Sequence, residues 1–249
     1  MKTIEAGGLV FGQGLPKICV PLTAPGLPAL QEEAAQAAVL PADLYEWRLD
    51  GFSGDVPAAL HALGKALPRP LLCTLRTQGE GGAAACPPEE YEERVCALLE
   101  LGGFALVDIE LSQGRQRVGR LVEKAKGRGI APVVSKHDFQ GTPPAGEIAA
   151  TLEGMAALGA ALPKYAVTPQ SPEDVLGLMS ATLQASRAVG PVVTMAMGPL
   201  GKVTRVSGGV FGSCMTFGAG PHASAPGQVP AEALPAILQA LDPDAGPVG

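Results

Sequence analysis

A chain of 249 residues, 47% hydrophobic and 17% charged, has the length and composition of one globular domain and not of a disordered segment. Its net charge of −6 and its lack of a basic run argue against nucleic acid as a partner. The five cysteines have no Cys-x-x-Cys spacing, and no apolar run is long enough for a signal peptide or a membrane span. We therefore expect a reduced, cytoplasmic protein with no membrane partner.

The chain begins with a predicted hairpin and continues with repeated β-α units. Residues 1–14 combine glycines with alternating apolar side chains, which predicts a β-hairpin that closes the bottom of a barrel. Short runs rich in Val, Ile and Leu then alternate with Ala-, Leu- and Glu-rich stretches. Eight strands are predicted at residues 17–22, 43–49, 70–75, 105–111, 131–135, 164–167, 191–195 and 212–217. Helical spacing is found at residues 27–39, 87–101 and 172–188.

Eight such units predict an α/β fold of the (β/α)8 TIM-barrel type, with residues 1–249 forming a single domain. The alternative is an open doubly wound sheet, which needs a glycine-rich phosphate turn after its first strand. Thr23-Ala24-Pro25-Gly26 lacks that pattern. Ser171-Pro172-Glu173-Asp174 has the features of a helix start, and residues 242–249 are predicted to form a polar tail.

Charged residues occur at the interior positions of several predicted strands. Alternate residues of a barrel strand face the helices and the interior, so each strand can be sorted by parity. In Tyr45-Glu46-Trp47-Arg48-Leu49-Asp50 the apolar set faces the helices, which directs Glu46, Arg48 and Asp50 inward. On four further strands the same test directs inward Arg76, Asp108, Glu110, His137 and Lys164.

One buried ion pair in a barrel is often only packing, but ionisable groups from five strands indicate a polar ligand site. Barrel active sites form at the carboxyl ends of the strands. The residues alone therefore predict an enzyme that acts on a small polyhydroxylated anion.

Lysine and histidine are the residue types that indicate the chemistry. A barrel lysine among arginines can attack a ketone, and Lys164 fits this role, with Lys17, Lys136 and Lys202 as alternatives. Lys136 should point away from the interior, because it adjoins His137 in the strand. His137, in a strand-end motif, is the expected proton carrier.

Arg205 follows the seventh predicted strand, where a guanidinium would suit a substrate carboxylate. The segment from Gly198 to Gly201 is too short for a nucleotide-binding P-loop. No group of His, Cys, Asp or Glu has zinc spacing, so we expect no metal.

Segments along most of the chain match one family in order. They are Glu46-Trp47-Arg48-Leu49-Asp50, Arg76-Thr77 with Glu80-Gly81-Gly82, Asp108-Ile109-Glu110, Ser135-Lys136-His137-Asp138-Phe139, Pro163-Lys164, Met197-Gly198 with Arg205-Val206, Phe211-Gly212-Ser213 and Ala223-Ser224-Ala225-Pro226-Gly227-Gln228. Because these segments occur in this order, the chain resembles the type I 3-dehydroquinate dehydratases.

The resemblance implies a cofactor-free dehydration of 3-dehydroquinate in the shikimate pathway, by a homodimer. The lysine matching Lys164 forms an imine with the substrate ketone, and the histidine matching His137 assists imine formation, proton transfer and imine hydrolysis. Glu110 and Asp108 match an acidic pair beside the histidine. The substrate hydroxyls and carboxylate are bound at the positions that match Glu46, Arg48, Arg76, Arg205, Ser224 and Gln228.

Residues 221–230 are too rich in proline and glycine for a helix or strand and are predicted to form a lid over the site. Lys136 stands where the family usually has an amide or aromatic residue, and this extra cation would lower the pKa of His137. Two alternatives come from other classes. A class I aldolase would use the same lysine with a phosphate site, and a non-catalytic barrel would be expected to have lost Lys164 or His137.

Overall fold

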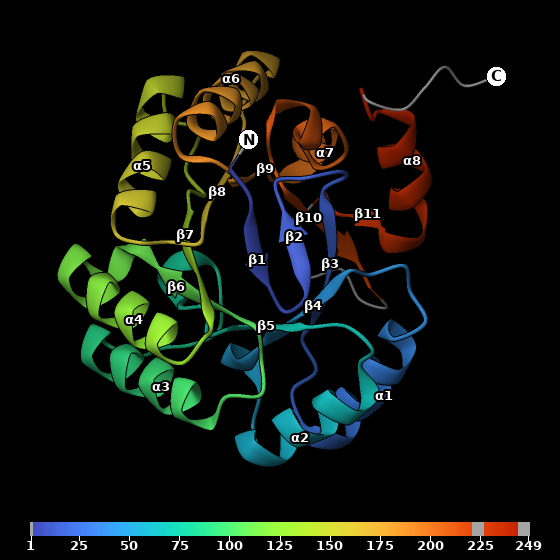
Figure 1. Ribbon diagram of the computed structural model, residues 1–249, viewed down its shortest axis with the longest axis vertical. Coiled ribbons are helices and arrows are strands. Elements are labelled where there is room, and N and C mark those ends of the chain that lie inside the picture. The colour runs from blue at the N-terminus through green and yellow to red at the C-terminus, as the bar shows by residue number, and fades with distance from the viewer. Residues whose placement is uncertain (1, 221–226, 244–249) are drawn as a thin grey trace.

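A ring of parallel strands surrounded by helices forms the body of the molecule (Figure 1). The computed structural model describes residues 2–220 and 227–243. The barrel strands are β3 (Lys17–Leu22), β4 (Leu44–Arg48), β5 (Leu71–Thr74), β6 (Leu106–Glu110), β7 (Ala131–His137), β8 (Leu162–Val167), β9 (Val193–Ala196) and β10 (Met215–Ala219). The helices are α1 (Leu27–Ala37), α2 (Val56–Ala66), α3 (Pro88–Leu101), α4 (Arg115–Gly127), α5 (Ala145–Ala157), α6 (Pro172–Val189), α7 (Gly198–Ser207) and α8 (Leu234–Ala240). Each predicted strand overlaps an observed one, and the predicted (β/α)8 barrel is confirmed.

The barrel closes between β9 and β10. The sheet has the order β11-β10-β3-β4-β5-β6-β7-β8-β9. Val192 and Ser213, just before β9 and β10, form a parallel bridge, and the Cys214 N–H donates to the Val192 carbonyl at 2.8 Å. β11 (Val229–Pro230) pairs with Gly218 and Ala219 of β10 outside this ring. The expectation that residues 221–230 contain no strand was wrong, because the short parallel pairing supplies hydrogen bonds that composition does not predict.

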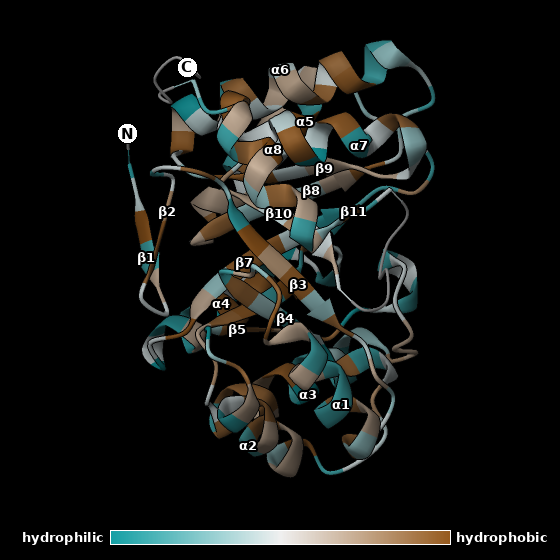
Figure 2. Ribbon diagram, turned by 90° about the vertical axis from the view of Figure 1, so that its right-hand side faces the viewer, coloured by the Kyte–Doolittle hydropathy of each residue, from teal (hydrophilic) through white to brown (hydrophobic). Residues whose placement is uncertain are grey.

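The predicted hairpin is confirmed and covers one end of the barrel (Figures 1 and 2). β1 (Ile4–Ala6) pairs antiparallel with β2 (Leu9–Phe11). Phe11 is fully buried among the side chains that fill the lower barrel interior, at the amino ends of the strands. The turn needs glycine, since Gly7 has φ +57° and a Cβ there would lie 2.6 Å from the Cβ of Pro70.

Two apolar layers hold the barrel together. The outer layer packs strands against helices and includes the fully buried Tyr45 and Trp47. The inner layer fills the lower interior with Leu44, Leu72 and other inward side chains. Burial of each large side chain contributes roughly 1.5–3 kcal/mol, so these layers supply most of the stabilising free energy. The strands accordingly appear mostly brown in the hydropathy view (Figure 2).

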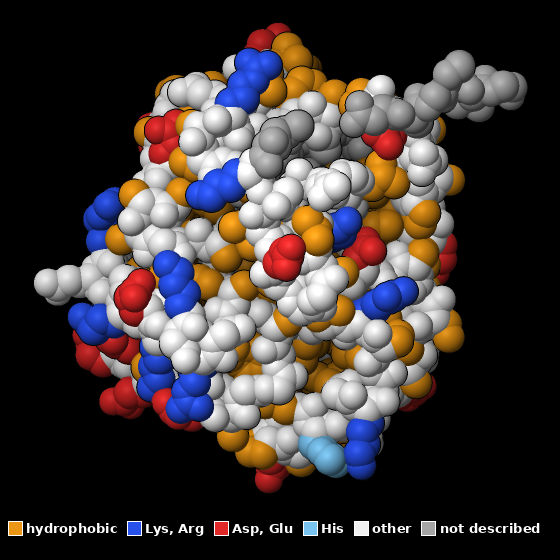
Figure 3. Space-filling model, in the orientation of Figure 1, with side chains coloured by type: hydrophobic (Ala, Val, Ile, Leu, Met, Phe, Trp, Pro, Cys, Tyr) orange, Lys and Arg blue, Asp and Glu red, His pale blue; other side chains and the backbone are white. Residues whose placement is uncertain are grey.

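Polar groups define the helix ends and the outer surface. The predicted start of α6 is confirmed: the Asp174 N–H donates to Ser171 Oγ, and the Ser171 N–H donates to the Asp174 carboxylate, both at 3.3 Å. Helices α3 and α4 are joined by ion pairs such as Arg117–Glu89 and Lys124–Glu100. Figure 3 shows acidic and basic side chains side by side over these helices.

Parts of two predicted segments lie outside the described residues. For the predicted lid these are residues 221–226, which include Ser224, and for the predicted tail they are residues 244–249.

Candidate active site

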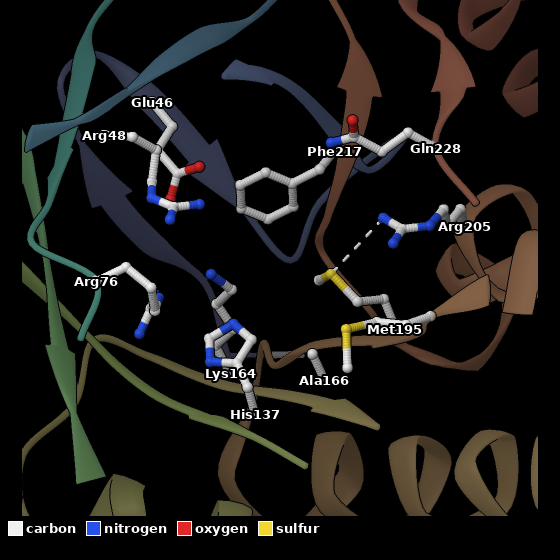
Figure 4. Close-up of a pocket in the computed structure, with 11 residues that line it drawn as sticks. Glu46, Arg48, Arg76, His137, Lys164, Ala166, Met195, Arg205, Phe217 and Gln228 are labelled. Carbon is white, nitrogen blue, oxygen red and sulfur yellow. Dashed lines mark hydrogen bonds between the residues drawn. The ribbon is translucent and has the colours of Figure 1, made fainter. Parts of the chain in front are cut away.

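The chemistry of the cavities, and not their size, identifies the candidate site. A cavity of about 60 Å³ lies inside the barrel at the carboxyl ends of the strands (Figure 4). It is lined by Glu46, Arg48, Arg76, His137, Lys164, Arg205 and Gln228, together with Ala166, Met195, Met197 and Phe217. Larger cavities of about 280 Å³ beside α1 and about 380 Å³ before α3 have no lysine, arginine or histidine among their described lining residues.

The predicted strand parity is confirmed for the residues that lie within the strands. On β4, Tyr45 and Trp47 pack outward against the helices, whereas Glu46 and Arg48 line the cavity. Lys136 also points outward as predicted, with its Nζ 5.0 Å from the centre of the Tyr165 ring. On β7 and β8 the inward Ser135 and Lys164 both contact Asp108 of β6, and His137 of β7 lines the cavity beside Lys164.

Lys164 is the buried lysine of the cavity. Only 4% of the residue is exposed, and its Nζ lies 3.3 Å from Asp108 Oδ2 and 4.7 Å from the centre of the Phe217 ring. The aromatic face and the carboxylate together fix the position of the amine. The alternatives lie elsewhere: Lys202 is exposed on α7, and Lys17 begins β3 at the opposite end of the barrel.

Arg76 compensates two buried carboxylates. Its Nη2 lies 2.8 Å from Asp108 Oδ2 and its Nη1 lies 3.1 Å from Glu110 Oε1. Ser135 Oγ donates to Asp108 at 2.6 Å. Burial alone would raise the pKa of Asp108, but the charges of Arg76 and Lys164 hold it below its ordinary value. Burial opposes the charged form of Arg76 as well, yet both carboxylates raise the pKa of Arg76 overall.

Glu80, not Glu110, is the carboxylate beside His137. Glu80 Oε2 accepts the His137 backbone N–H at 2.7 Å and contacts the ring Nδ1 at 2.9 Å. The described hydrogen bonds of Glu110 come from Arg76, Thr77 and Gln113. This corrects the predicted placement of the acidic pair beside the histidine. Glu80 lies in a loop, where strand parity does not predict which way a side chain points. Its only indication in the sequence was the Glu80-Gly81-Gly82 segment that matches the family.

The histidine ring is neutral in this setting. Burial, followed by the charges of Arg76, Lys164 and Arg48, lowers the pKa of His137 well below its ordinary value of 6.5. Burial also raises the pKa of Glu80, so neither shift favours an ion pair, and the contact is a hydrogen bond from neutral Nδ1–H to the carboxylate. This tautomer leaves Nε2 as the basic nitrogen. The lowered pKa agrees with expectation, but Lys136 is not its cause, because that side chain lies outside the barrel wall.

Arg205 and Gln228 lie on the side of the cavity opposite Arg76 and Arg48 (Figure 4). Arg205 projects from α7, is 3% exposed, and has its Nη1 3.9 Å from Met195 Sδ. Burial lowers the pKa of Arg205 to about 10, which leaves it charged at neutral pH. Gly227 permits the approach of Gln228, because a Cβ at Gly227 would lie 2.3 Å from the Gly198 carbonyl oxygen.

The third side of the cavity is built from β4. Glu46 is 4% exposed and accepts a hydrogen bond from Thr74 Oγ1 at 2.8 Å. Arg48 pairs with Asp50, whose two carboxylate oxygens accept from its Nε and Nη2 at 2.7 and 2.8 Å. Asp50 itself belongs to a 3-10 turn after the strand and lies behind Arg48, so it does not line the cavity as parity predicted.

Residues 2–220 and 227–243 contain neither a metal-binding cluster nor a membrane-spanning helix. No group of three or more His, Cys, Asp or Glu side chains in these ranges could hold a metal ion. No helix within the same ranges is long and apolar enough to cross a membrane. The expectation that the chemistry needs no metal stays a prediction.

The fold and this cavity define the class of the protein: a (β/α)8-barrel enzyme with its site at the carboxyl ends of the strands. Comparisons narrow the class. The family model described as type I 3-dehydroquinase matches residues 18–244. The 3-dehydroquinate dehydratase of Listeria monocytogenes serotype 4b is 42% identical over 97% of this chain and 98% of the relative. That of Neisseria gonorrhoeae is 45% identical over 94% of each.

Solved structures agree. The 3-dehydroquinate dehydratase of Geobacillus kaustophilus superposes with a TM-score of 0.93 at 35% identity, covering 96% of each chain. The type I enzyme of Clostridium difficile superposes with a TM-score of 0.92 at 34% identity, covering 96% of this chain and 98% of the other. The chain belongs to the type I 3-dehydroquinase family, and it is therefore a dehydratase of the lyase class that acts on a small molecule. This family membership argues against the two alternatives, a class I aldolase and a non-catalytic barrel.

Proposed function

We propose that the chain converts 3-dehydroquinate to 3-dehydroshikimate and water through a Schiff base on Lys164, with His137 as the general acid and base. The observation that carries this proposal is a buried lysine in the same cavity as a neutral histidine, with Arg205 and Gln228 across from them (Figure 4). The Clostridium difficile relative is described with covalently modified comenic acid, which supports a covalent mechanism in the family.

In the proposed reaction the neutral Lys164 amine attacks the substrate ketone, and the carbinolamine loses water to give a protonated imine. The imine draws electrons from the adjacent carbon, which loses a proton to form an enamine. The enamine then expels the tertiary hydroxyl, which leaves as water after it receives a proton. A water molecule finally hydrolyses the imine and releases Lys164, so the net change is the loss of one water. His137 Nε2 is the group that carries these protons.

The substrate is oriented by charges at the two sides of the cavity. Arg205, with Gln228 and the matched Ser224, is proposed to bind the carboxylate, and burial of Arg205 strengthens its attraction for an anion. Glu46 and Arg48 are proposed to bind hydroxyls. Arg76 has both Nη1 hydrogens engaged by Glu110 and Ser135, so only its Nε and one Nη2 hydrogen remain for substrate.

Three acidic residues have proposed roles that differ from those implied by the resemblance to the family. Glu80 is proposed to fix the His137 tautomer, whereas Asp108 is proposed to hold the Lys164 amine. Glu110 has no described contact with His137, so its proposed part is to hold Arg76 and Thr77.

We also propose a cofactor-free cytoplasmic homodimer in the shikimate pathway of aromatic amino acid biosynthesis. Light scattering on purified protein tests the dimer.

The decisive experiment combines an assay with trapping. 3-Dehydroquinate should give a rise in 3-dehydroshikimate absorbance, and borohydride added during turnover should attach one ligand mass to Lys164. Lys136→Ala is the matched control, since that lysine adjoins His137 on β7 but faces outward. An adduct on another lysine, or normal turnover by Lys164→Ala, would contradict the mechanism.

A further inference from the structure

Asp50 connects a cavity residue to the loop that carries Glu80. Its two oxygens accept from Arg48 Nε and Nη2, and Oδ2 also accepts the Ala83 N–H at 2.9 Å. The Arg76 N–H lies 3.4 Å from Oδ1. Only 5% of the Asp50 side chain is exposed, and Arg48 lowers its pKa despite the opposing effect of burial. One buried carboxylate therefore meets donors from three segments of the chain.

The loop of residues 77–84 is a compact unit with Glu80 at its centre. The Gly82 N–H donates to the Thr77 carbonyl at 2.8 Å, and the Ala84 N–H donates to the Arg76 carbonyl at 3.1 Å. Gly82 is required for this path, because a Cβ there would lie 2.2 Å from the Arg76 carbonyl oxygen. These hydrogen bonds tie Ala83 and Glu80 into one short loop, so we expect a displacement at Ala83 to displace Glu80.

The far side of this loop contacts β7 and the residues that follow this strand. A Cβ at Gly81 would lie 2.2 Å from Cζ of Phe139, whose ring is stacked on His137 with centroids 6.4 Å apart. Glu80 meets the same strand through its hydrogen bonds to His137. The loop is thus fixed against β7 on one flank, and Asp50 is its contact with the β4 side of the cavity.

We propose that Asp50 is a positioning residue that sets Arg48 and the Glu80 loop together, and through Glu80 the ring of His137. The proposal rests on the catalytic role given above to His137. By occupying Nε and one Nη2 hydrogen, Asp50 turns the remaining edge of the guanidinium of Arg48 toward the cavity. By accepting from Ala83, it sets the distance between that guanidinium and the loop.

The chemistry requires a carboxylate, because each Asp50 oxygen accepts from one Arg48 nitrogen and lies near one backbone N–H, and an amide has only one acceptor oxygen. Asp50→Asn has nearly the same shape, but in either orientation its NH2 group faces one nitrogen of Arg48 and one backbone N–H. Two measurable consequences follow. Misplacement of Arg48 should raise KM, and misplacement of the loop should lower kcat.

The test is a double-mutant cycle on kcat between Asp50→Asn and Glu80→Gln. Asp50→Asn should lower kcat about tenfold in the unmodified background and less than about twofold in the Glu80→Gln background, the size of coupling expected for residues that share one network. Equal factors in both backgrounds would overturn the proposal. So would a fall in melting temperature with no change in kcat, which is the result of a merely structural role.

A second variant and a control keep the result interpretable. Asp50→Glu retains a carboxylate for Arg48 but displaces it from Ala83, so KM should return toward that of the unmodified chain while kcat stays low. Recovery of neither constant, or of both, would contradict the proposal that Asp50 positions Arg48 and the loop separately. Asp43→Asn is the matched control, because Asp43 also accepts a backbone N–H, that of Ile18 at 2.8 Å, but at the other end of the barrel. It should leave kcat unchanged. If the unmodified chain does not dehydrate 3-dehydroquinate, the proposed function fails before this test begins.

Discussion

The two ends of the barrel interior are built on the same strands but differ in chemistry. β4 passes from Leu44 to Glu46 at successive inward positions, and β8 passes from Leu162 to Lys164. The lower end buries apolar area, which stabilises the fold directly. The upper end buries charges, whose desolvation must be offset by partners placed within hydrogen-bonding distance. The comparison indicates that the apolar end supplies most of the stabilising free energy, and that the charged end depends on its ion pairs and hydrogen bonds to offset the cost of desolvation.

Substitution of Arg76 should have the largest effect, because it acts on both stability and activity. Arg76→Met removes the one cation paired with buried Glu110 among its described partners and leaves Asp108 with Lys164 alone, which should cost about 3–5 kcal/mol of unfolding free energy and abolish turnover. Denaturant unfolding measures the first effect. Arg94→Met, which removes an exposed pair with Glu90, should cost only about 0.3–0.5 kcal/mol. Similar losses in the two variants would contradict the comparison.

Loss of His137 should affect the reaction and spare the fold. His137→Ala should lower kcat by about 10²–10⁴-fold, because a proton moves in every proposed step, and covalent species should accumulate. Rapid quenching with borohydride followed by mass spectrometry measures that accumulation. His61→Ala, an exposed change on α2, is the control. A near-normal rate without trapped imine would leave His137 with a structural role only.

A change at the lower end should show the opposite pattern. Phe11→Leu removes part of a fully buried ring beneath the barrel and should lower the unfolding free energy by about 1–2 kcal/mol. It should leave kcat and KM unchanged, since the cavity lies at the other end of the strands. Steady-state kinetics at a temperature well below the melting point checks this. A marked change in kcat would mean that the two ends are coupled.

The pH dependence should reflect the lowered pKa of His137. The neutral ring is the base, so the acid limb of kcat/KM should lie below pH 6.5, the ordinary value for histidine. The same shift affects stability, because below about pH 6.5 the histidine of the unfolded chain takes up a proton while the buried ring stays neutral. The contribution of His137 to the unfolding free energy is therefore complete above about pH 6.5 and is lost as the pH falls toward the pKa of the folded chain. Lys136→Ala should leave the limb in place. A limb above 6.5, or one that moves in this variant, is the contrary result.

Chelation should have no effect at all. The described carboxylates of the site are paired with arginine, lysine, histidine or hydroxyl groups and do not form a ligand cluster. Prolonged dialysis against a chelator should leave turnover unchanged. Activity that is lost and then restored by zinc, magnesium or manganese would require a different mechanism.

The sequence by itself determined the parts that depend on periodicity. Alternation along each strand sets which residues face the interior, so the barrel and the inward positions of Glu46, Asp108, His137 and Lys164 were predictable before any contact was known. The outward position of Lys136 followed from the same rule. These features are local, because the backbone of a strand fixes the direction of each side chain.

Only the tertiary structure decided which charged groups meet. Glu80 and His137 are 57 positions apart, and Asp50 and Ala83 are 33 apart. Glu80, Ala83 and Asp50 all lie in turns after strands, where no repeat constrains direction and several carboxylates could reach the same histidine. The choice of Glu80 over Glu110 depends on how loop 77–84 folds back on Arg76, a path that the close approach at Gly82 permits. Sequence spacing carries no information about such a contact, since its energy comes from groups that become neighbours only when the barrel closes.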